Sequence, residues 1–346
     1  MTSFAGWQMP LRYTSETAEH QAVRNAAGLF DLSHMGEIAV AGPGAGALLD
    51  YALVGNLSAL RPGRARYTMI CADDGGVLDD LVVYRLDEDQ FLVIANASNT
   101  EVVFGALRDR SGGFDARVED ATEDWALVAI QGPAAARILG PLASDLDLVA
   151  LKYYAGAFGS VAGRRAWVAR TGYTGEDGFE VFCRPEDAVP VWDLLAAAGG
   201  PAGLVPAGLA ARDTLRLEAG MPLYGNELGP DVTPFEAGLG RVVKFDKPGE
   251  FVGREALAAR AASGPVRRLA GLTIQSRRIA RHGYPVLADG VECGVVTSGA
   301  PSPTLGVPIA MAFLEPAADD HVLTVGIRGE AVPAQLTDLP FYRRRH

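Results

Sequence analysis

Hydrophobic and polar residues alternate along five short runs between residues 36 and 132. Val, Ile, Tyr and Phe dominate these runs, and Gly, Asp or Asn bound them, which is typical of β-strands. The runs are GEIAVAG, ARYTMICA, GVLDDLVVYRL, QFLVIANA and WALVAIQG. Because they follow one another without long parallel-crossover units, they predict an α+β domain.

Apolar residues recur at a spacing of three to four in other segments, which predicts amphipathic helices. Three such helices are expected over residues 44–53, 99–110 and 185–198. The last of them begins with Pro and two acids, as helix N-termini prefer. A fourth helix is expected over residues 208–220, where Gly220 can end it.

From residue 253 the pattern changes to one short helix and then a series of strands. GREALAARAA is expected to be helical, and the predicted strands are RRLAGLTIQ, GYPVLA, CGVVTSG, IAMAFL, HVLTVGI and AVPAQL. Their spacing predicts a C-terminal β-barrel or sandwich. The turn-rich stretch at residues 245–251 sets the expected boundary, so that residues 1–248 form a first region and residues 249–346 a second.

Composition and charge narrow the classes of function. The chain has 346 residues, 49% of them apolar, and no apolar run approaches the roughly 20 residues that span a bilayer, so no membrane partner is expected. A formal net charge of −11 opposes general attraction to nucleic acid. Three distant cysteines form no disulfide pattern and the N-terminus carries no secretory signal, so we expect a cytoplasmic protein.

Several common catalytic motifs are missing from the sequence. The five histidines and three cysteines have no metal-ligand spacing, so no metal is expected. There is no G-x-S-x-G nucleophile motif, and GPGAG at residues 42–46 lacks the third glycine of a dinucleotide loop. Metal, hydrolase and dinucleotide chemistry therefore have no support in the sequence.

The adjacent acids Asp79 and Asp80 follow a Gly-Gly turn at the start of a predicted strand. Side chains alternate along a strand, so the two carboxylates point to opposite faces. Asp80 then shares a face with Tyr84, and Tyr67 on the preceding strand would join them if the two strands pair. Spacing alone favours the simpler alternative, that both acids are turn residues, by roughly two to one.

Glu180 and Arg212 are two further candidates. Glu180 lies between Phe179 and Val181, so its carboxylate faces either solvent or a cavity in which it needs an N–H partner. Arg212 lies in an otherwise apolar helix and, if buried, needs an acceptor or an aromatic face. The alternatives are a polar hairpin loop for Glu180 and an exposed ion pair for Arg212.

Six segments resemble, in order, the successive motifs of the aminomethyltransferase family, and together they cover nearly the whole chain. They are FAGWQMPLRY, EHQAVRNAAGLFDLSHMGE, GGVLDDLVVY, RTGYTGEDGFEV, LAARDTLRLEAGMPLYGNEL and VTSGAPSPTLGVPIAMAF. The resemblance implies a three-lobed cloverleaf, with two interwoven α+β folate-binding lobes and a C-terminal β-barrel. Members of the family usually carry a longer segment before FAGW. We therefore expect either that the true start of this protein lies upstream of Met1 or that a helix of the family is missing here.

The same resemblance implies site residues and chemistry. By position in the motifs, Asp80 corresponds to the catalytic aspartate, while Glu180 and Arg212 correspond to residues that hold the pterin. The aromatic folate contacts and the further pocket positions correspond to Tyr67, Tyr84, Tyr173, Met35 and Asn96. The implied reaction moves an aminomethyl carbon from lipoylated H-protein to the co-substrate tetrahydrofolate, with release of ammonia.

Two other functions stay open at this point. One is another folate-dependent demethylase of the same family that works without H-protein, since family membership does not fix the reaction. The other is a non-catalytic folate-binding regulatory protein. The joint presence of Asp80, Glu180 and Arg212 disfavours the regulatory protein.

Overall fold

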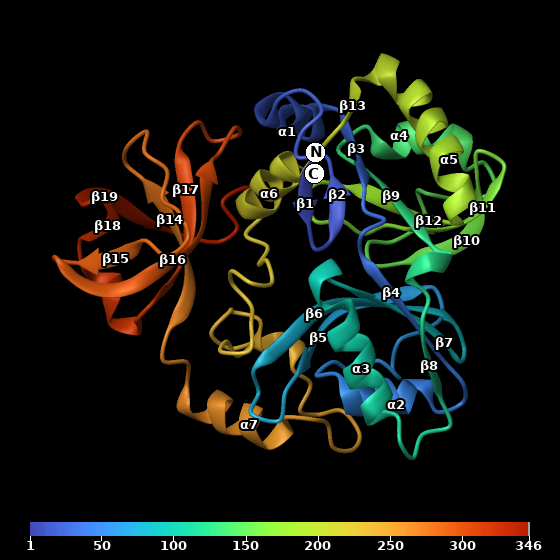
Figure 1. Cartoon of the computed structure of the whole chain (residues 1–346), viewed down its shortest axis with the longest axis horizontal. Helices are drawn as coiled ribbons and strands as arrows, with labels where there is room; N and C mark the ends of the chain where they lie inside the picture. The colour runs from blue at the N-terminus through green and yellow to red at the C-terminus, as the bar shows by residue number, and fades with distance from the viewer. Residues whose placement is uncertain (345–346) are drawn as a thin grey trace.

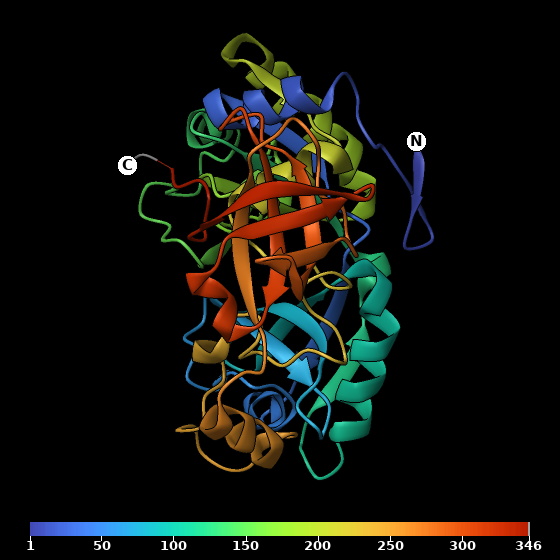
Figure 2. The same cartoon turned by 90° about the vertical axis from the view of Figure 1, so that its left-hand side faces the viewer.

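The computed structural model describes residues 1–344, apart from the side chains of residues 319 and 320, and has three lobes (Figure 1). The last two residues of the expected second region therefore lie outside the described part. A two-stranded hairpin, β1 (Thr2–Phe4) and β2 (Trp7–Met9), projects from the body near the N-terminus (Figure 2).

A five-stranded antiparallel sheet forms the first lobe, at the lower right of Figure 1, with the strand order β5-β6-β7-β4-β8. Two helices cover one face, because Leu48, Leu49 and Val103 pack against the apolar residues of the sheet. The elements are β4 (Gly36–Ala41), α2 (Ala45–Ala52), β5 (Arg64–Cys71), β6 (Val77–Asp87), β7 (Gln90–Ala95), η1 (Ala97–Asn99), α3 (Thr100–Arg110) and β8 (Arg117–Asp120).

A six-stranded sheet forms the second lobe, at the upper right of Figure 1, with the order β10-β11-β12-β9-β3-β13. The lobes are interwoven, since the chain leaves this sheet after β3 for the first lobe and returns at β9, which pairs with β3. The elements are α1 (Glu16–Asn25), β3 (Ala27–Asp31), η2 (Thr122–Asp124), β9 (Ala126–Gln131), α4 (Ala135–Leu139), η3 (Gly140–Leu142), β10 (Gly156–Val161), β11 (Arg164–Ala169), β12 (Gly178–Cys183), α5 (Pro185–Gly199), η4 (Gly200–Ala202) and β13 (Leu204–Pro206).

The inner faces of these two sheets pack on each other. One apolar cluster joins Tyr84 and Ile94 of the first sheet to Trp167 and Phe182 of the second. The outer face of the second sheet is covered by α4 and α5, which belong to a separate apolar cluster. Polar side chains on the inner faces are therefore brought together at the junction of the two lobes.

A closed barrel forms the third lobe, with the order β14-β17-β16-β15-β18-β19; it lies at the left of Figure 1 and faces the viewer in Figure 2. The helix α6 (Leu209–Glu218) contacts both α1 and the barrel strands β16 and β17. The elements from the connector onward are η5 (Gly240–Val242), α7 (Arg254–Ser263), β14 (Arg268–Ile274), β15 (Pro285–Ala288), β16 (Val291–Pro301), β17 (Pro308–Leu314), η6 (Pro316–Asp320), β18 (Leu323–Ile327) and β19 (Glu330–Thr337).

The strands and helices predicted from the hydrophobic pattern are confirmed, with ends that differ by a few residues. The helix α1 was not predicted, because its buried positions include Glu19, His20 and Arg24 and so show no apolar periodicity. The domain boundary after residue 248 stays a prediction. Within residues 1–344, none of the helices combines the length and apolar character that crossing a membrane requires.

Candidate active site

Asp80 lies on the inner face of the first sheet and is held by two neighbours. The strands β5 and β6 pair with each other, with Met69 opposite Asp80 and Tyr67 opposite Val82, so Tyr67 and Asp80 share one face. The Tyr67 hydroxyl donates to Asp80 Oδ2 at 3.0 Å, and Asn96 Nδ2 donates to Asp80 Oδ1 at 2.9 Å. The structure thus brings together three residues that the sequence placed in one site.

Asp79 lies on the opposite face of the same strand, toward the N-terminus of α3. It is fully buried and accepts hydrogen bonds from the main chain of Asn96 and from the side chains of Asn96 and Asn99. Burial raises the pKa of Asp80 to about 6. Burial, together with the charge of Asp80, raises the pKa of Asp79 to about 7.

Glu180 lies on β12, on the inner face of the second sheet. The Tyr84 hydroxyl donates to Glu180 Oε2 at 3.1 Å, and the Thr171 hydroxyl donates to the same oxygen. Within residues 1–344, Glu180 Oε1 receives no hydrogen bond. Since the Tyr84 ring is fully buried, its hydroxyl orients Glu180, and one carboxylate oxygen is left for a ligand.

Arg212 projects from α6 and is half-buried. Its guanidinium carbon lies 4.9 Å from the centroid of the Tyr173 ring, and the Tyr173 hydroxyl donates to the carbonyl of Pro222. Burial lowers the pKa of Arg212 from its usual value. Among the described residues, none accepts a hydrogen bond from the Arg212 side chain, so its donors are available to a ligand.

Met35 packs against the apolar cluster between the two sheets. His34 and Glu37, close to Met35 in the sequence, are both buried. Within the described chain, the His34 Nδ1 atom and both carboxylate oxygens of Glu37 have no hydrogen-bond partner. Burial lowers the pKa of His34 to about 4, to which the Arg212 charge contributes. Burial raises the pKa of Glu37 to about 9, and the charges of Asp120 and Glu180 add to this.

Sequence reasoning did not identify several polar residues of this junction. Thr171 and Tyr154 were missed because their proximity to the site depends on how the two sheets face each other. Burial raises the pKa of Tyr154, and the charges of Tyr153, Glu180 and Asp80 add to this, so Tyr154 lies near both carboxylates. Glu37 did carry a signal, since it is an acid inside the apolar run of β4.

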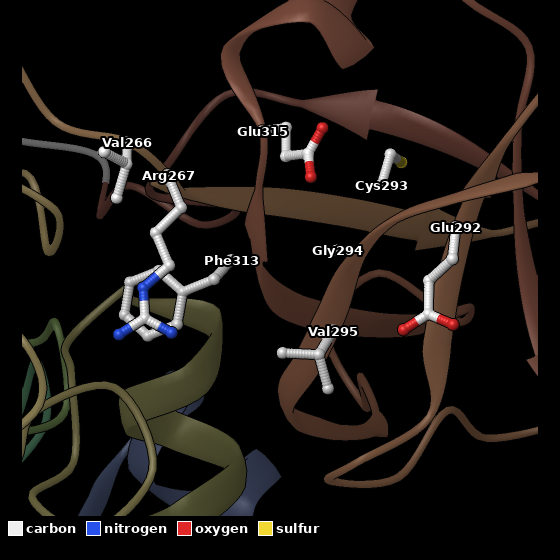
Figure 3. A pocket seen from close by; sticks show the side chains of 8 residues that line it. All are labelled: Val266, Arg267, Glu292, Cys293, Gly294, Val295, Phe313 and Glu315. Atoms are coloured by element: carbon white, nitrogen blue, oxygen red, sulfur yellow. The ribbon is translucent and has the colours of Figure 1, made fainter.

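A cavity of about 550 Å³ lies elsewhere, on the barrel (Figure 3). The Arg267 guanidinium stacks over the Phe313 ring at 4.6 Å and also pairs with Glu236 at 2.9 Å. None of the residues that the sequence predicts for the site lines this cavity. The candidate site is therefore the junction of the first two lobes.

Two domain families match the chain. The family described as the GCVT N-terminal domain matches residues 1–247, and the one described as the glycine cleavage T-protein C-terminal barrel domain matches residues 267–343. An aminomethyltransferase of Streptomyces coelicolor is 61% identical over 351 residues, which cover 100% of this chain and 94% of the relative. The chain belongs to the aminomethyltransferase family.

Other relatives agree with this assignment. An aminomethyltransferase of Saccharopolyspora erythraea is 62% identical over 349 residues, which cover 99% of this chain and 94% of the relative. The crystal structure of glycine cleavage system aminomethyltransferase T from Bartonella henselae matches with a TM-score of 0.92 at 36% identity, covering 100% of this chain and 94% of that one.

Membership of the aminomethyltransferase family confirms three predictions. The resemblance is correct, the fold is the expected α+β cloverleaf with a closed barrel, and the enzyme class is that of the folate-dependent aminomethyltransferases of glycine cleavage. The roles assigned to individual site residues stay predictions.

Proposed function

We propose that this chain moves the aminomethyl carbon from the lipoyl sulfur of H-protein to tetrahydrofolate. The products are ammonia, reduced lipoyl H-protein and 5,10-methylenetetrahydrofolate. The observation that carries the proposal is the meeting of Asp80 and Glu180 at one junction, each held by a tyrosine hydroxyl. Family membership supports the use of folate and of an H-protein partner.

The two carboxylates lie at different points along the junction, which suits an extended ligand such as a folate. Asp80 and Tyr84 are four residues apart on one strand face, a separation of about 13 Å along the strand, and Tyr84 contacts Glu180. A folate offers a pterin edge rich in N–H donors and, some distance away, the two nitrogens that receive the carbon. One carboxylate can therefore hold the edge while the other works at the reacting nitrogens.

Glu180 and Arg212 fit the pterin by their unused hydrogen-bonding capacity. Glu180 Oε1 can accept from the pterin N–H donors, and the planar Arg212 guanidinium can donate to the pterin carbonyl. Tyr173, against which Arg212 rests, offers an aromatic face. Tyr67 and Met35 complete the proposed lining with the Asn96 amide.

Asp80 is the residue that we assign to proton transfer. Its two oxygens are fixed by Tyr67 and Asn96, and burial raises its pKa to about 6, close to the range in which a carboxylate exchanges protons efficiently at neutral pH. It can orient the folate nitrogens, accept the proton lost during attack, and stabilise positive charge that develops on the transferred carbon. We place the reaction in the cytoplasm, in keeping with three free, buried cysteines.

A glycine cleavage assay tests this proposal against the alternative of a demethylase that works without H-protein. Purified chain is mixed with tetrahydrofolate and aminomethylated H-protein, and ammonia and methylenetetrahydrofolate are measured. We expect both products in equal amounts, and none when apo H-protein without lipoate is supplied. Folate binding without either product would favour the regulatory protein instead.

A further inference from the structure

One side-chain amide joins the carboxylates of Asp79 and Asp80. Asn96 Nδ2 lies 2.8 Å from Asp79 Oδ1 and 2.9 Å from Asp80 Oδ1, and an amide nitrogen has one hydrogen for each. The main-chain N–H of Asn96 donates to the other oxygen of Asp79 at 2.9 Å. Asp79 therefore holds Asn96 at two points, and Asn96 in turn holds Asp80.

The position of Asn96 makes this bridge between two faces of a sheet possible. Asn96 directly follows β7, which pairs with β6 so that Val82 is opposite Ile94. Continuing that register by two residues brings Asn96 opposite Asp80, at the point where the strand ends. Because β7 ends at Ala95, the Asn96 side chain is not confined to one face of the sheet and reaches the carboxylates on both sides of β6.

A fully buried carboxylate needs compensation, and Asp79 receives it from the start of α3. Asn99 Nδ2 donates to Asp79 Oδ1 at 2.8 Å. A negative charge near a helix N-terminus is also favourable. Asp79 thus has a defined set of donors although it lies on the side of the sheet away from the proposed folate.

We propose that Asp79 is a positioning residue for the transfer reaction: through Asn96 it fixes the orientation of the Asp80 carboxylate and makes the two carboxylates titrate as a pair. The inference rests on the proposed function, because it takes Asp80 as the group that works on the substrate. Two carboxylates that share a donor and lie next to each other lose their protons in two coupled steps.

The groups around the pair stay neutral while it titrates. Tyr67 contacts Asp80, and the charges of the pair act on Tyr154, Tyr173 and Tyr224, whose pKa values, like that of Tyr67, are all raised in the first place by burial. Between pH 5 and pH 9 these tyrosines keep their protons. Glu37, on the inner face of the same sheet, has a pKa of about 9 and titrates only at the upper end of this range. Changes of charge near Asp80 between about pH 5 and pH 8 are therefore assigned to Asp79 and Asp80.

The test compares three variants of the full-length chain with the wild type. Asp79→Asn removes the charge, and Asn99→Ala removes one donor to Asp79 without touching Asp80. The matched control is Asp73→Asn, an exposed aspartate on the turn that leads from β5 into β6. The readouts are kcat and KM for tetrahydrofolate from pH 5 to pH 9, and the ¹³C carboxyl shifts of labelled aspartates over the same range.

We expect Asp79→Asn to lower kcat by about 10- to 100-fold while KM for tetrahydrofolate changes by no more than about threefold, because a misplaced catalytic group costs turnover. Its pH profile and its carboxyl shifts should show one ionisation where the wild type shows two. Asn99→Ala should move the upper ionisation to higher pH, since a hydrogen bond that stabilises the charged form is lost. Asp73→Asn should behave as the wild type.

The proposal is overturned if Asp79→Asn and Asn99→Ala both keep the two wild-type ionisations and change only protein stability. If Asp79→Asn does not fold, Asn99→Ala and the wild-type carboxyl titration decide alone. A paired titration by ¹³C shifts in a wild-type chain that does not transfer the aminomethyl carbon would contradict the proposed function instead, so the two failures are distinguishable.

Discussion

Glu180 is the residue whose free capacity most directly indicates a ligand. Tyr84 and Thr171 occupy its Oε2 atom, whereas Oε1 receives no hydrogen bond within the described chain. A carboxylate with one oxygen free of hydrogen bonds is well suited to an N–H donor of a pterin. The carboxylate charge should therefore matter more than the side-chain shape.

We expect Glu180→Gln to weaken tetrahydrofolate binding by about 10- to 100-fold, since hydrogen bonds to a charged group contribute on the order of 1.5–3 kcal/mol. Isothermal titration at pH 7 measures this effect. The matched control is Glu186→Gln, an exposed acid at the start of α5, which should leave the affinity unchanged. Equal affinities for wild type and Glu180→Gln would remove Glu180 from the binding site.

For single residues, the sequence predicted correctly those features that depend on strand geometry alone. The alternation along β6 predicted that Asp79 and Asp80 face opposite sides. The pairing of β6 with β5, which was the condition for bringing Tyr67 to Asp80, is present. The contact between Tyr84 and Glu180 could not be predicted in this way, because the two residues belong to different sheets. The position of Glu180 between apolar residues made it a candidate, and only the family motifs gave it a role in holding the pterin.

Glu37 on strand β4 is a buried carboxyl group that reduces the stability of the fold at neutral pH. Both carboxylate oxygens are buried without a hydrogen-bond partner in the described chain, and burial, with Asp120 and Glu180 adding to it, raises the pKa of this side chain to about 9. Glu37 is therefore protonated at neutral pH in the folded chain but ionised in the unfolded chain. Unfolding releases a proton, so this residue lowers the stability of the fold progressively as the pH rises from about 4.5 to about 9.

Replacing Glu37 by Gln should remove this pH-dependent term. We expect the free energy of unfolding of Glu37→Gln, relative to wild type, to increase between pH 5 and pH 9 by on the order of a few kcal/mol. Urea unfolding at several pH values measures it, with Glu88→Gln, an exposed acid of the same lobe, as the control. A difference that stays constant with pH would show that Glu37 is ionised in the folded state.

The helix α1 illustrates why an element can escape pattern analysis. Ser15 caps it by accepting from Ala18, and Glu19 follows within the first turn, so its N-terminus is well formed. Its inward face, however, is polar: His20 contacts Thr214 on α6, and Arg24 contacts Glu218 on the same helix. Hydrophobic periodicity detects helices that bury apolar stripes and therefore missed this one.

A buried polar network connects the barrel to the second lobe. Arg24 pairs with Glu218 at 2.9 Å and with Glu176 at 2.9 Å, and its guanidinium lies 4.0 Å from the centroid of the Tyr342 ring near the C-terminus. Thr304, from the barrel, donates to Glu218 at 2.8 Å. Because this cluster is buried, the contact between the lobes depends on every member of it being paired.

Glu218 should be the most sensitive member of this network. Burial alone would raise its pKa, but hydrogen bonds from His20, Ser302 and Thr304 lower the pKa to about 2. Because the pKa in the folded chain is below that of the unfolded chain, the stabilisation is fully present above about pH 4.5 and is lost as the pH falls toward 2.

We expect Glu218→Gln to lower the free energy of unfolding at pH 7 by about 3–5 kcal/mol, since the change breaks a buried ion pair and leaves Glu176 as the remaining carboxylate that pairs with Arg24 within residues 1–344. The pair of half-buried Arg85 with exposed Glu88 offers a control, and Glu88→Gln should cost less than about 1 kcal/mol. Chemical unfolding measures both. A loss for Glu218→Gln as small as that of the control, or one that does not shrink below pH 4, would contradict this account.

The arrangement of the whole molecule was only partly accessible from the sequence. The regular strand spacing after residue 268 predicted a barrel or a sandwich, and closure depends on the pairing of β14 with β19, which lie far apart along the chain. The interweaving of the first two lobes likewise depends on β3 pairing with the distant β9. The family resemblance supplied both features, because motif order reports long-range topology that local patterns do not.

The central claim is that Asp80 is the working carboxylate of tetrahydrofolate-dependent aminomethyl transfer. Single-turnover transfer from aminomethylated H-protein, measured beside tetrahydrofolate affinity for wild type and Asp80→Asn, tests it most directly. We predict that Asp80→Asn binds tetrahydrofolate within about threefold of wild type and transfers the carbon at least about 100-fold more slowly. Transfer by Asp80→Asn at a rate near that of wild type would contradict the account.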